Sequence, residues 1–137
     1  MTITGSCLCG SIQYSADVDQ YTSALCHCTD CQKLQGDQGY VPSARVHKAD
    51  LSNRPGTPST YDVTGNSGKI NKHFFCSGCG SSLYTELEIM PDSTVIKAGG
   101  LDNGAAKLGG KIDLELYVKD RVPYLAAAEG AKQQEAM

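Results

Sequence analysis

Tryptophan is absent from this sequence of 137 residues, and phenylalanine occurs only twice. Charged residues make up 20% and the net charge is −3, so no basic excess points to nucleic acid or to an anionic membrane surface. No apolar run approaches the length needed to cross a bilayer. These absences argue against a nucleic-acid-binding protein and against a membrane-spanning chain.

The start of the chain lacks the pattern of a secretion signal, because Met1 to Ser6 contain no basic region followed by an apolar run. We therefore expect a protein of a reducing, cytoplasmic compartment. The length is typical of a single domain with a modest core. We expect this domain to span 1–125, and we expect the tail over 126–137, rich in Ala, Glu, Lys and Gln, to be helical or disordered.

Cysteine and glycine are abundant instead, with seven and fifteen residues. The many glycines and the missing tryptophan predict a turn-rich, mainly β protein rather than a helical bundle. Closely spaced cysteines let one short loop place two thiolates on the same metal ion, and Zn²⁺ prefers four tetrahedral ligands. The cysteines form three tight groups: Cys7-Leu8-Cys9, Cys26-His27-Cys28-Thr29-Asp30-Cys31 and Cys76-Ser77-Gly78-Cys79.

Three other interpretations of these cysteines agree less well with the sequence. Disulfides are common in small secreted proteins, but the odd count, the missing signal and the Cys-x-Cys spacing oppose them here. Unrelated reduced cysteines would scatter along the chain rather than cluster beside glycines. An iron–sulfur cluster also suits four thiolates, but zinc fits the spacing better.

Alternating apolar and polar residues predict a series of strands separated by glycine-rich turns. Residues 29–35 are expected to form one or two helical turns ended by Gly36, with Cys28 and Cys31 at their start. Pro42 suggests an edge strand or a bulge for its segment. The expected strands are 10–16, 21–25, 40–46, 59–63, 72–76, 82–88, 94–98 and 112–118.

The seven sulfurs cannot complete two tetrahedra, which is the first indication of catalysis. Cys76-x-x-Cys79-Gly80 has the form of a zinc knuckle, and Cys7-x-Cys9-Gly10 is a shorter version of the same turn. Pairing these knuckles gives a closed structural site and leaves the central three cysteines with a second metal ion. The competing partition combines Cys7 and Cys9 with the central group and completes the other site with His27 or His73. Spacing alone modestly favours the first partition and does not exclude the second.

Together these motifs resemble the glutathione-dependent formaldehyde-activating family, which also includes centromere protein V. The resemblance runs from Gly5 to about Leu125. It is carried by the segments Gly5-Ser6-Cys7-Leu8-Cys9-Gly10, Cys26-His27-Cys28-Thr29-Asp30-Cys31-Gln32-Lys33, Phe75-Cys76-Ser77-Gly78-Cys79-Gly80-Ser81-Ser82-Leu83, Gly99-Gly100-Leu101-Asp102 and 115–124.

The resemblance implies a β-tent built from folded-over antiparallel sheets and two zinc ions per chain. It implies that Cys7, Cys9, Cys76 and Cys79 bind a structural zinc, and that Cys26, Cys28 and Cys31 bind a catalytic one. The family name implies a carbon–sulfur lyase reaction in which glutathione and formaldehyde give S-(hydroxymethyl)glutathione. The loop after the central motif departs from the family pattern, and Tyr124 stands where the family has tryptophan, so a different substrate is left open.

Such a reaction needs a proton shuttle, and the sequence offers His27, Asp37, His73 and Glu86. Lys33, Arg45, Lys48 and Lys72 are candidates for contacts with the carboxylates of glutathione. We expect a small-molecule substrate, glutathione or another thiol, and neither nucleic acid nor membrane as a partner; a homo-oligomer is left open. The alternative hypothesis is a non-catalytic zinc module that binds another protein.

Overall fold

The structure of the chain is a computed structural model that describes residues 2–18, 20–35, 42–47, 52–53 and 56–137. It is mainly β, as the sequence predicted, with one short α-helix and three 3₁₀ turns among the described residues. The elements are β1 (Thr2–Ser6), β2 (Gln13–Asp17), β3 (Tyr21–Cys26), α1 (Thr29–Gln35), β4 (Pro42–His47), β5 (Ser52–Asn53), β6 (Ser59–Thr64), β7 (Ile70–Phe75), β8 (Ser82–Leu87), β9 (Ser93–Lys97), η1 (Ala98–Gly100), η2 (Ala105–Gly110), β10 (Leu114–Leu116), η3 (Val118–Asp120) and β11 (Lys132–Gln133).

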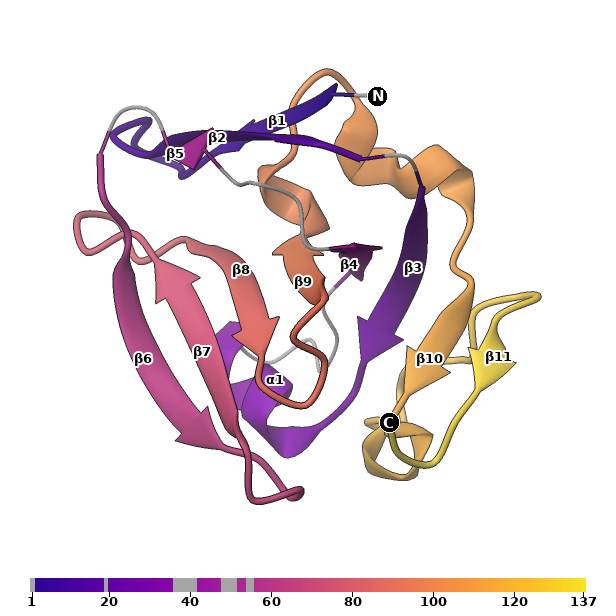
Figure 1. Cartoon of the computed structure of the whole chain (residues 1–137). Helices are drawn as coiled ribbons and strands as arrows, with labels where there is room; N and C mark the ends of the chain where they lie inside the picture. The colour runs from indigo at the N-terminus through magenta and orange to yellow at the C-terminus, as the bar shows by residue number, and fades with distance from the viewer. Residues whose placement is uncertain (1, 19, 36–41, 48–51, 54–55) are drawn as a thin grey trace.

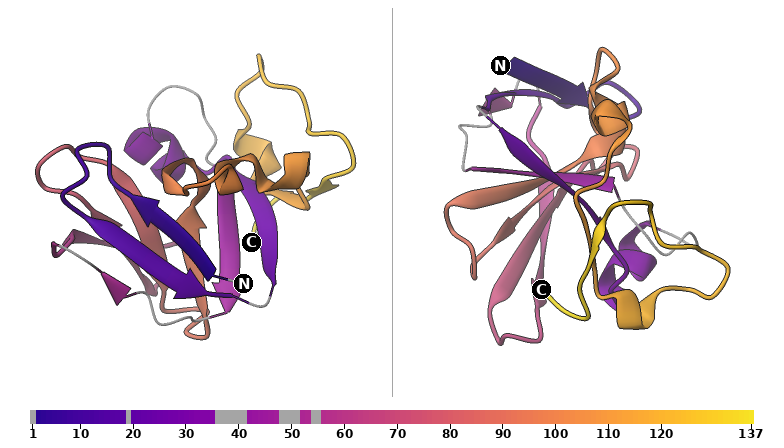
Figure 2. Two further views of the ribbon diagram at one scale, coloured as in Figure 1. Left: turned by 90° about the horizontal axis from the view of Figure 1, so that it is seen from above. Right: turned by 90° about the vertical axis from the view of Figure 1, so that its right-hand side faces the viewer.

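The strands form a large curved sheet and a small one. The large sheet has the order β11-β10-β3-β4-β9-β8-β7-β6, and the small sheet has the order β1-β2-β5. Figure 1 shows the large sheet bending around the molecule, with β6, β7 and β8 on one side and β3 and β10 on the other. The small sheet lies across one end of it, as the two views in Figure 2 also show. This arrangement agrees with the predicted tent of folded-over sheets.

Strand register assigns each residue of the large sheet to one of two faces. Residues paired across neighbouring antiparallel strands point to the same side, and residues two apart along a strand do so as well. Phe74 pairs with Tyr84, and Tyr84 pairs with Ile96, so these three side chains share one face. They form the apolar core, in which Phe74 stacks on Tyr84 with ring centroids 4.5 Å apart and Tyr14 of β2 meets Tyr84 edge-on at 6.0 Å.

Two expectations from the sequence were wrong. The tail over 126–137 contains no helix; Lys132–Gln133 form β11, which pairs with β10 in parallel because Glu115 holds this segment through side-chain hydrogen bonds. Pro42 belongs to β4, which lies between β3 and β9 rather than at an edge. It is tolerated there because it occupies the first position of the strand. Among the described residues, no helix has the length and apolar character required to cross a bilayer.

Candidate metal centre

Two matching turns bring the first group of four cysteines together. In the turn between β1 and β2, the Gly10 N–H donates to the Cys7 carbonyl at 3.1 Å; in the turn between β7 and β8, the Gly80 N–H donates to the Cys76 carbonyl at 2.8 Å. Both glycines have φ of 78°, a left-handed conformation in which a side chain would be strained. The two turns therefore have the same local geometry.

The sulfur atoms of these two turns are spaced as a tetrahedral zinc requires. With Zn–S bonds of about 2.3 Å, ligand sulfurs lie about 3.8 Å apart. The Cys7 and Cys9 sulfurs are 3.6 Å apart, and the Cys9 and Cys76 sulfurs are 3.8 Å apart. Ser81 of the second turn accepts a 2.9 Å hydrogen bond from the Leu8 N–H of the first. The structure thus groups Cys7, Cys9, Cys76 and Cys79 as the knuckle pairing predicted.

Hydrogen-bond donors favour the thiolates of Cys7 and Cys79. Burial by itself would raise the pKa of Cys7, but hydrogen bonds from the Ile12 N–H and the Ser11 hydroxyl outweigh it and lower the pKa to about 7. Hydrogen bonds from the side chain and backbone of Ser81 lower the pKa of Cys79 to about 5. At Cys9 a hydrogen bond from Ser11 acts in the same direction, but the neighbouring Cys7 and Cys79 sulfurs outweigh it and raise the pKa of Cys9. Because only a deprotonated cysteine binds zinc, these donors prepare the site for the metal.

The second group consists of Cys26, Cys28 and Cys31, whose sulfurs also lie within 4.8 Å of one another. Cys26 ends β3, and the other two lie at the start of α1, where the Cys31 N–H contacts the Cys28 sulfur at 3.3 Å. Hydrogen bonds from the Cys26 and Cys31 thiols lower the pKa of Cys28, whereas the neighbouring sulfurs raise the pKa of Cys26. Three sulfurs at this distance cannot all carry a negative charge unless a cation joins them.

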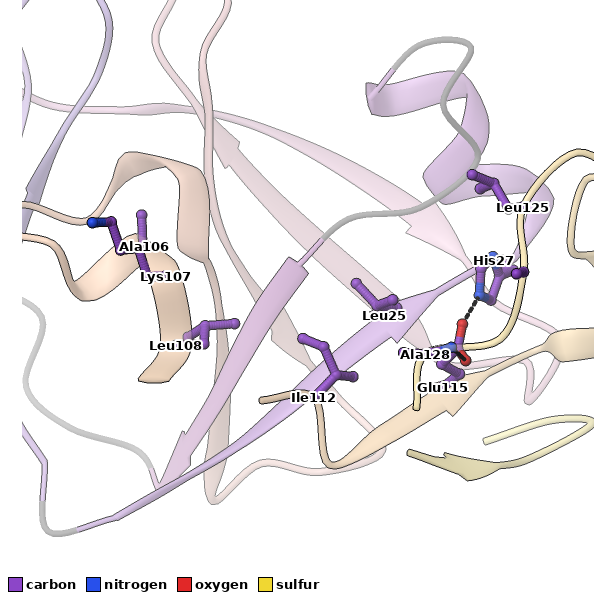
Figure 3. Close-up of a pocket in the computed structure, with 10 residues that line it drawn as sticks. Leu25, His27, Ala106, Lys107, Leu108, Ile112, Glu115, Leu125 and Ala128 are labelled. Atoms are coloured by element: carbon purple, nitrogen blue, oxygen red, sulfur yellow. Dashed lines mark hydrogen bonds and ion pairs between the residues drawn. The ribbon is translucent and has the colours of Figure 1, made fainter. Parts of the chain in front are cut away.

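Neither histidine named in the competing partition belongs to a metal-competent group in the described part of the chain. His27 is only 1% exposed, and its Nε2 lies 2.7 Å from Oε1 of Glu115. Figure 3 shows this contact at the end of a pocket of about 370 Å³ that Leu25, Leu108, Ile112 and Leu125 also line. His27 lines this pocket, but the flanking Cys26 and Cys28 do not, and neither does any other described cysteine.

Glu115 collects four donors around its carboxylate, although it is completely buried. Besides His27, these donors are the Ala128 N–H at 2.8 Å, the Gln133 Nε2 at 2.7 Å and the Arg121 guanidinium at 3.2 Å. Burial alone would raise the pKa of Glu115, but the four donors outweigh this and lower it to about 2. Glu115, which sequence reasoning missed, therefore links His27 to the C-terminal segment.

The other predicted site residues lie in different parts of the structure and do not form one group. His73 lies on β7 and is 8% exposed, with Nδ1 3.1 Å from the Thr85 hydroxyl. Glu86 lies on the opposite face, where it lines a groove of about 340 Å³ together with Lys72 and Asp62. Lys33 is exposed in the last turn of α1. Arg45 belongs to β4 but its side chain, like Asp37 and Lys48, lies outside what the structure describes.

Two residues near the three-cysteine group were missed by sequence reasoning. Lys97, at the end of β9, is 8% exposed. A hydrogen bond with Cys26 would lower the pKa of Cys31, but neighbouring Cys28 and burial outweigh it and raise this pKa to about 11. The charge of Lys97 opposes the rise. Tyr117 follows β10, and burial together with the charges of Cys26 and Cys28 raises the pKa of its hydroxyl. Neither residue lies in a recognisable sequence motif, because each comes close to the three cysteines only through pairing between strands that are distant in sequence.

The chain thus has a mainly β scaffold with one group of four cysteines and one of three, each of which could hold a metal ion. The model of the glutathione-dependent formaldehyde-activating enzyme family matches residues 2–120, and the chain belongs to this family. No curated protein matches the chain.

A solved structure of a Rhodobacter sphaeroides protein is similar to this chain, with a TM-score of 0.63 and 19% sequence identity. The match covers 80% of this chain and 96% of the other. At this identity the likeness supports the fold alone.

Proposed function

We propose that the protein is a zinc-dependent carbon–sulfur lyase that makes or breaks the adduct of a thiol and a carbonyl compound. The model reaction is that of the family name: the sulfur of glutathione bonds to the carbon of formaldehyde, the carbonyl π bond opens and the thiol proton passes to the oxygen. The observation that supports the proposal is the inequality of the two cysteine groups, four sulfurs against three.

The group of four fits a structural zinc. Its sulfurs are supplied by two tight turns from distant parts of the chain, so a bound ion would join β1–β2 to β7–β8 and contribute free energy of folding. Both turns end in a glycine that a side chain would strain, which suits a rigid, closed site. We assign no catalytic role to these four cysteines.

The group of three fits a catalytic zinc, because three protein ligands leave a tetrahedral ion one position for another molecule. Zinc bound there would supply Lewis acidity, which lowers the pKa of an incoming thiol and polarises a carbonyl. The described residues provide no fourth cysteine, histidine or carboxylate within the same group. Cys26, Cys28 and Cys31 would hold the ion, and the side chains around them would carry out the proton transfer.

His73 is the best-placed proton carrier among the three candidates that the structure describes. Burial, followed by the charge of Lys97, lowers the pKa of His73, so its imidazole is neutral near pH 7 and can accept a proton. His27 is engaged by Glu115, and Glu86 lies on the other face of the sheet. The charge of Cys28 also acts on His73, which supports its closeness to the three-cysteine group.

The proposal is tested by measuring the exchange between free and thiol-bound aldehyde by NMR, with the zinc-loaded protein and a panel of thiols that includes glutathione. We expect the protein to accelerate exchange for at least one thiol–aldehyde pair and Cys28→Ser to abolish the acceleration while the fold persists. A protein that holds two zinc ions but accelerates exchange for no pair would instead be a non-catalytic zinc module.

A further inference from the structure

We propose that Lys97 and His73 form an anion-binding site beside the three-cysteine group, which selects thiols that carry a carboxylate one or two carbons from the sulfur. The inference rests on the proposed function, because the sulfur of such a ligand would occupy the fourth position at the zinc. Glutathione differs from this class, since its carboxylates lie many bonds from its sulfur.

Strand register places the relevant residues on one face of the large sheet. His73 pairs with Thr85, Thr85 pairs with Val95, and Lys97 lies two residues beyond Val95 on β9. From Lys97 the pairing continues through Ser43 to Ala24, two residues before Cys26. Since paired residues and residues two apart share a side, His73, Lys97 and Cys26 all belong to the face opposite the apolar core.

Lys97 is a buried residue without a carboxylate partner in the part of the chain that the structure describes. Its side chain is 8% exposed, and no described Asp or Glu lies within ion-pairing distance of it. Keeping a cation in such a position costs free energy unless negative charge is close. The cysteine group supplies negative charge on the same face, since strand pairing places Lys97 two strands from Ala24, which is two residues before Cys26.

His73 supplies a second polar group on the same face. Its Nδ1 contacts the Thr85 hydroxyl at 3.1 Å, while its buried Nε2 has no hydrogen-bond partner among the described residues. A buried polar atom without a partner is costly, and such atoms commonly serve a ligand. Burial, followed by the charge of Lys97, lowers the pKa of His73, and the charge of Asp30 opposes this.

The charge balance of the site explains why a cation is needed there. Three thiolates around Zn²⁺ leave a net charge near −1, and an incoming thiolate makes it −2. A further carboxylate on the ligand would be repelled unless a positive group stood beside it. Lys97 provides this charge, and the Nε2 of His73, when it carries the proton, donates a hydrogen bond to the second carboxylate oxygen.

Mercaptoacetate and 2-mercaptoethanol test the proposal directly, because both are two-carbon thiols and only the first is a carboxylate. Binding of each to the zinc-loaded protein is measured by isothermal titration calorimetry at neutral pH, with the zinc content checked afterwards. We expect the wild-type protein to bind mercaptoacetate about tenfold more tightly, the scale of a hydrogen bond to a charged group. The Lys97→Met variant should lose this preference, whereas Lys97→Arg should keep most of it.

Lys69→Met is the matched control, since it removes the same charge from an exposed residue in the turn before β7. It should leave the preference unchanged. Equal binding of both thiols by the wild-type protein overturns the inference without any variant, and so does a preference that survives in a folded Lys97→Met protein. Failure of every thiol to bind would contradict the proposed function itself.

Discussion

At the scale of single residues, the two cysteine groups should respond differently to the loss of one sulfur. Cys76 is 2% exposed and belongs to the group that joins two distant turns, so Cys76→Ser removes a metal site on which folding depends. Cys28 lies at the start of α1, outside the apolar core. We expect Cys76→Ser to abolish cooperative thermal unfolding and Cys28→Ser to retain it with one zinc ion fewer.

This comparison needs only melting curves and the zinc content of the two purified variants. Similar melting curves for both variants would contradict the division into a structural and a catalytic site.

Tyr14 is predicted to make stability depend on alkaline pH. Burial, followed by the charge of Asp102 and the neighbouring Tyr84, raises the pKa of Tyr14 to about 12 from an unfolded value near 10. The neutral hydroxyl is favoured in the folded state, so its contribution is complete below pH 10 and is lost as the pH rises through 12. The free energy of unfolding should fall by about 2 kcal/mol over this range from Tyr14 alone.

The Tyr14→Phe variant should not show this fall, and the measurement is urea unfolding at several pH values. At neutral pH it should be as stable as the wild type or slightly more stable, because the buried Tyr14 hydroxyl has no hydrogen-bond partner among the described residues. Tyr61→Phe, which removes a hydroxyl from a 63% exposed ring, is the control. An unchanged pH profile in Tyr14→Phe would refute the assignment.

At the scale of secondary-structure elements, the small sheet depends on a close approach at Gly5. A Cβ atom there would lie 2.4 Å from the Tyr14 ring and 2.7 Å from the Gly100 carbonyl oxygen. Gly5→Ala must therefore displace β1 from β2 or from η1, at a cost of about 2 kcal/mol. Gly99→Ala, with open space around the new methyl group, is the matched control.

The melting temperatures of these two variants test this prediction, and only that of Gly5→Ala should fall. Equal melting temperatures for Gly5→Ala and the wild type would show that the packing of β1 against Tyr14 and η1 is looser than the structure indicates.

The C-terminal segment is attached mainly through Glu115. Gln133 of β11 donates from its side chain to the buried carboxylate at 2.7 Å, whereas the side chain of the neighbouring Gln134 makes no hydrogen bond to the described residues. Gln133→Ala should lower the free energy of unfolding by about 1–2 kcal/mol, because the carboxylate loses one of its donors. Gln134→Ala, which keeps its backbone hydrogen bonds, should have a smaller effect in the same urea titration; equal effects would contradict this role for Glu115.

The sequence predicted the elements that have a strong local pattern. The strands at 59–63, 82–88 and 94–98 were expected within a residue or two of β6, β8 and β9, and α1 matches the expected helical turns. β1, β5 and β11 were missed, because two of them have only two residues and β1 is defined by its pairing with β2. The composition of the tail predicts a helix or disorder, because composition carries no information about the hydrogen bonds that the tail makes to the buried Glu115.

At the scale of the whole molecule, the cysteine groups were predictable and their surroundings were not. The two knuckles are recognisable from the spacing of their cysteines and from the glycine that follows. The sequence could therefore favour the group of four cysteines that the structure shows. Lys97 and His73 come together only because β9, β8 and β7 are adjacent in the large sheet. Such proximity depends on pairing between strands distant in sequence, which a pattern of single residues does not encode.

The central claim is that the two metal sites are unequal, and a crystal structure of the resting protein with data collected at the zinc absorption edge tests it most directly. We expect two zinc ions per chain. One should be bound by the four sulfurs of Cys7, Cys9, Cys76 and Cys79, and the other by Cys26, Cys28 and Cys31 with a non-protein fourth ligand. A single ion per chain, or two ions both fully coordinated by side chains, would contradict the account.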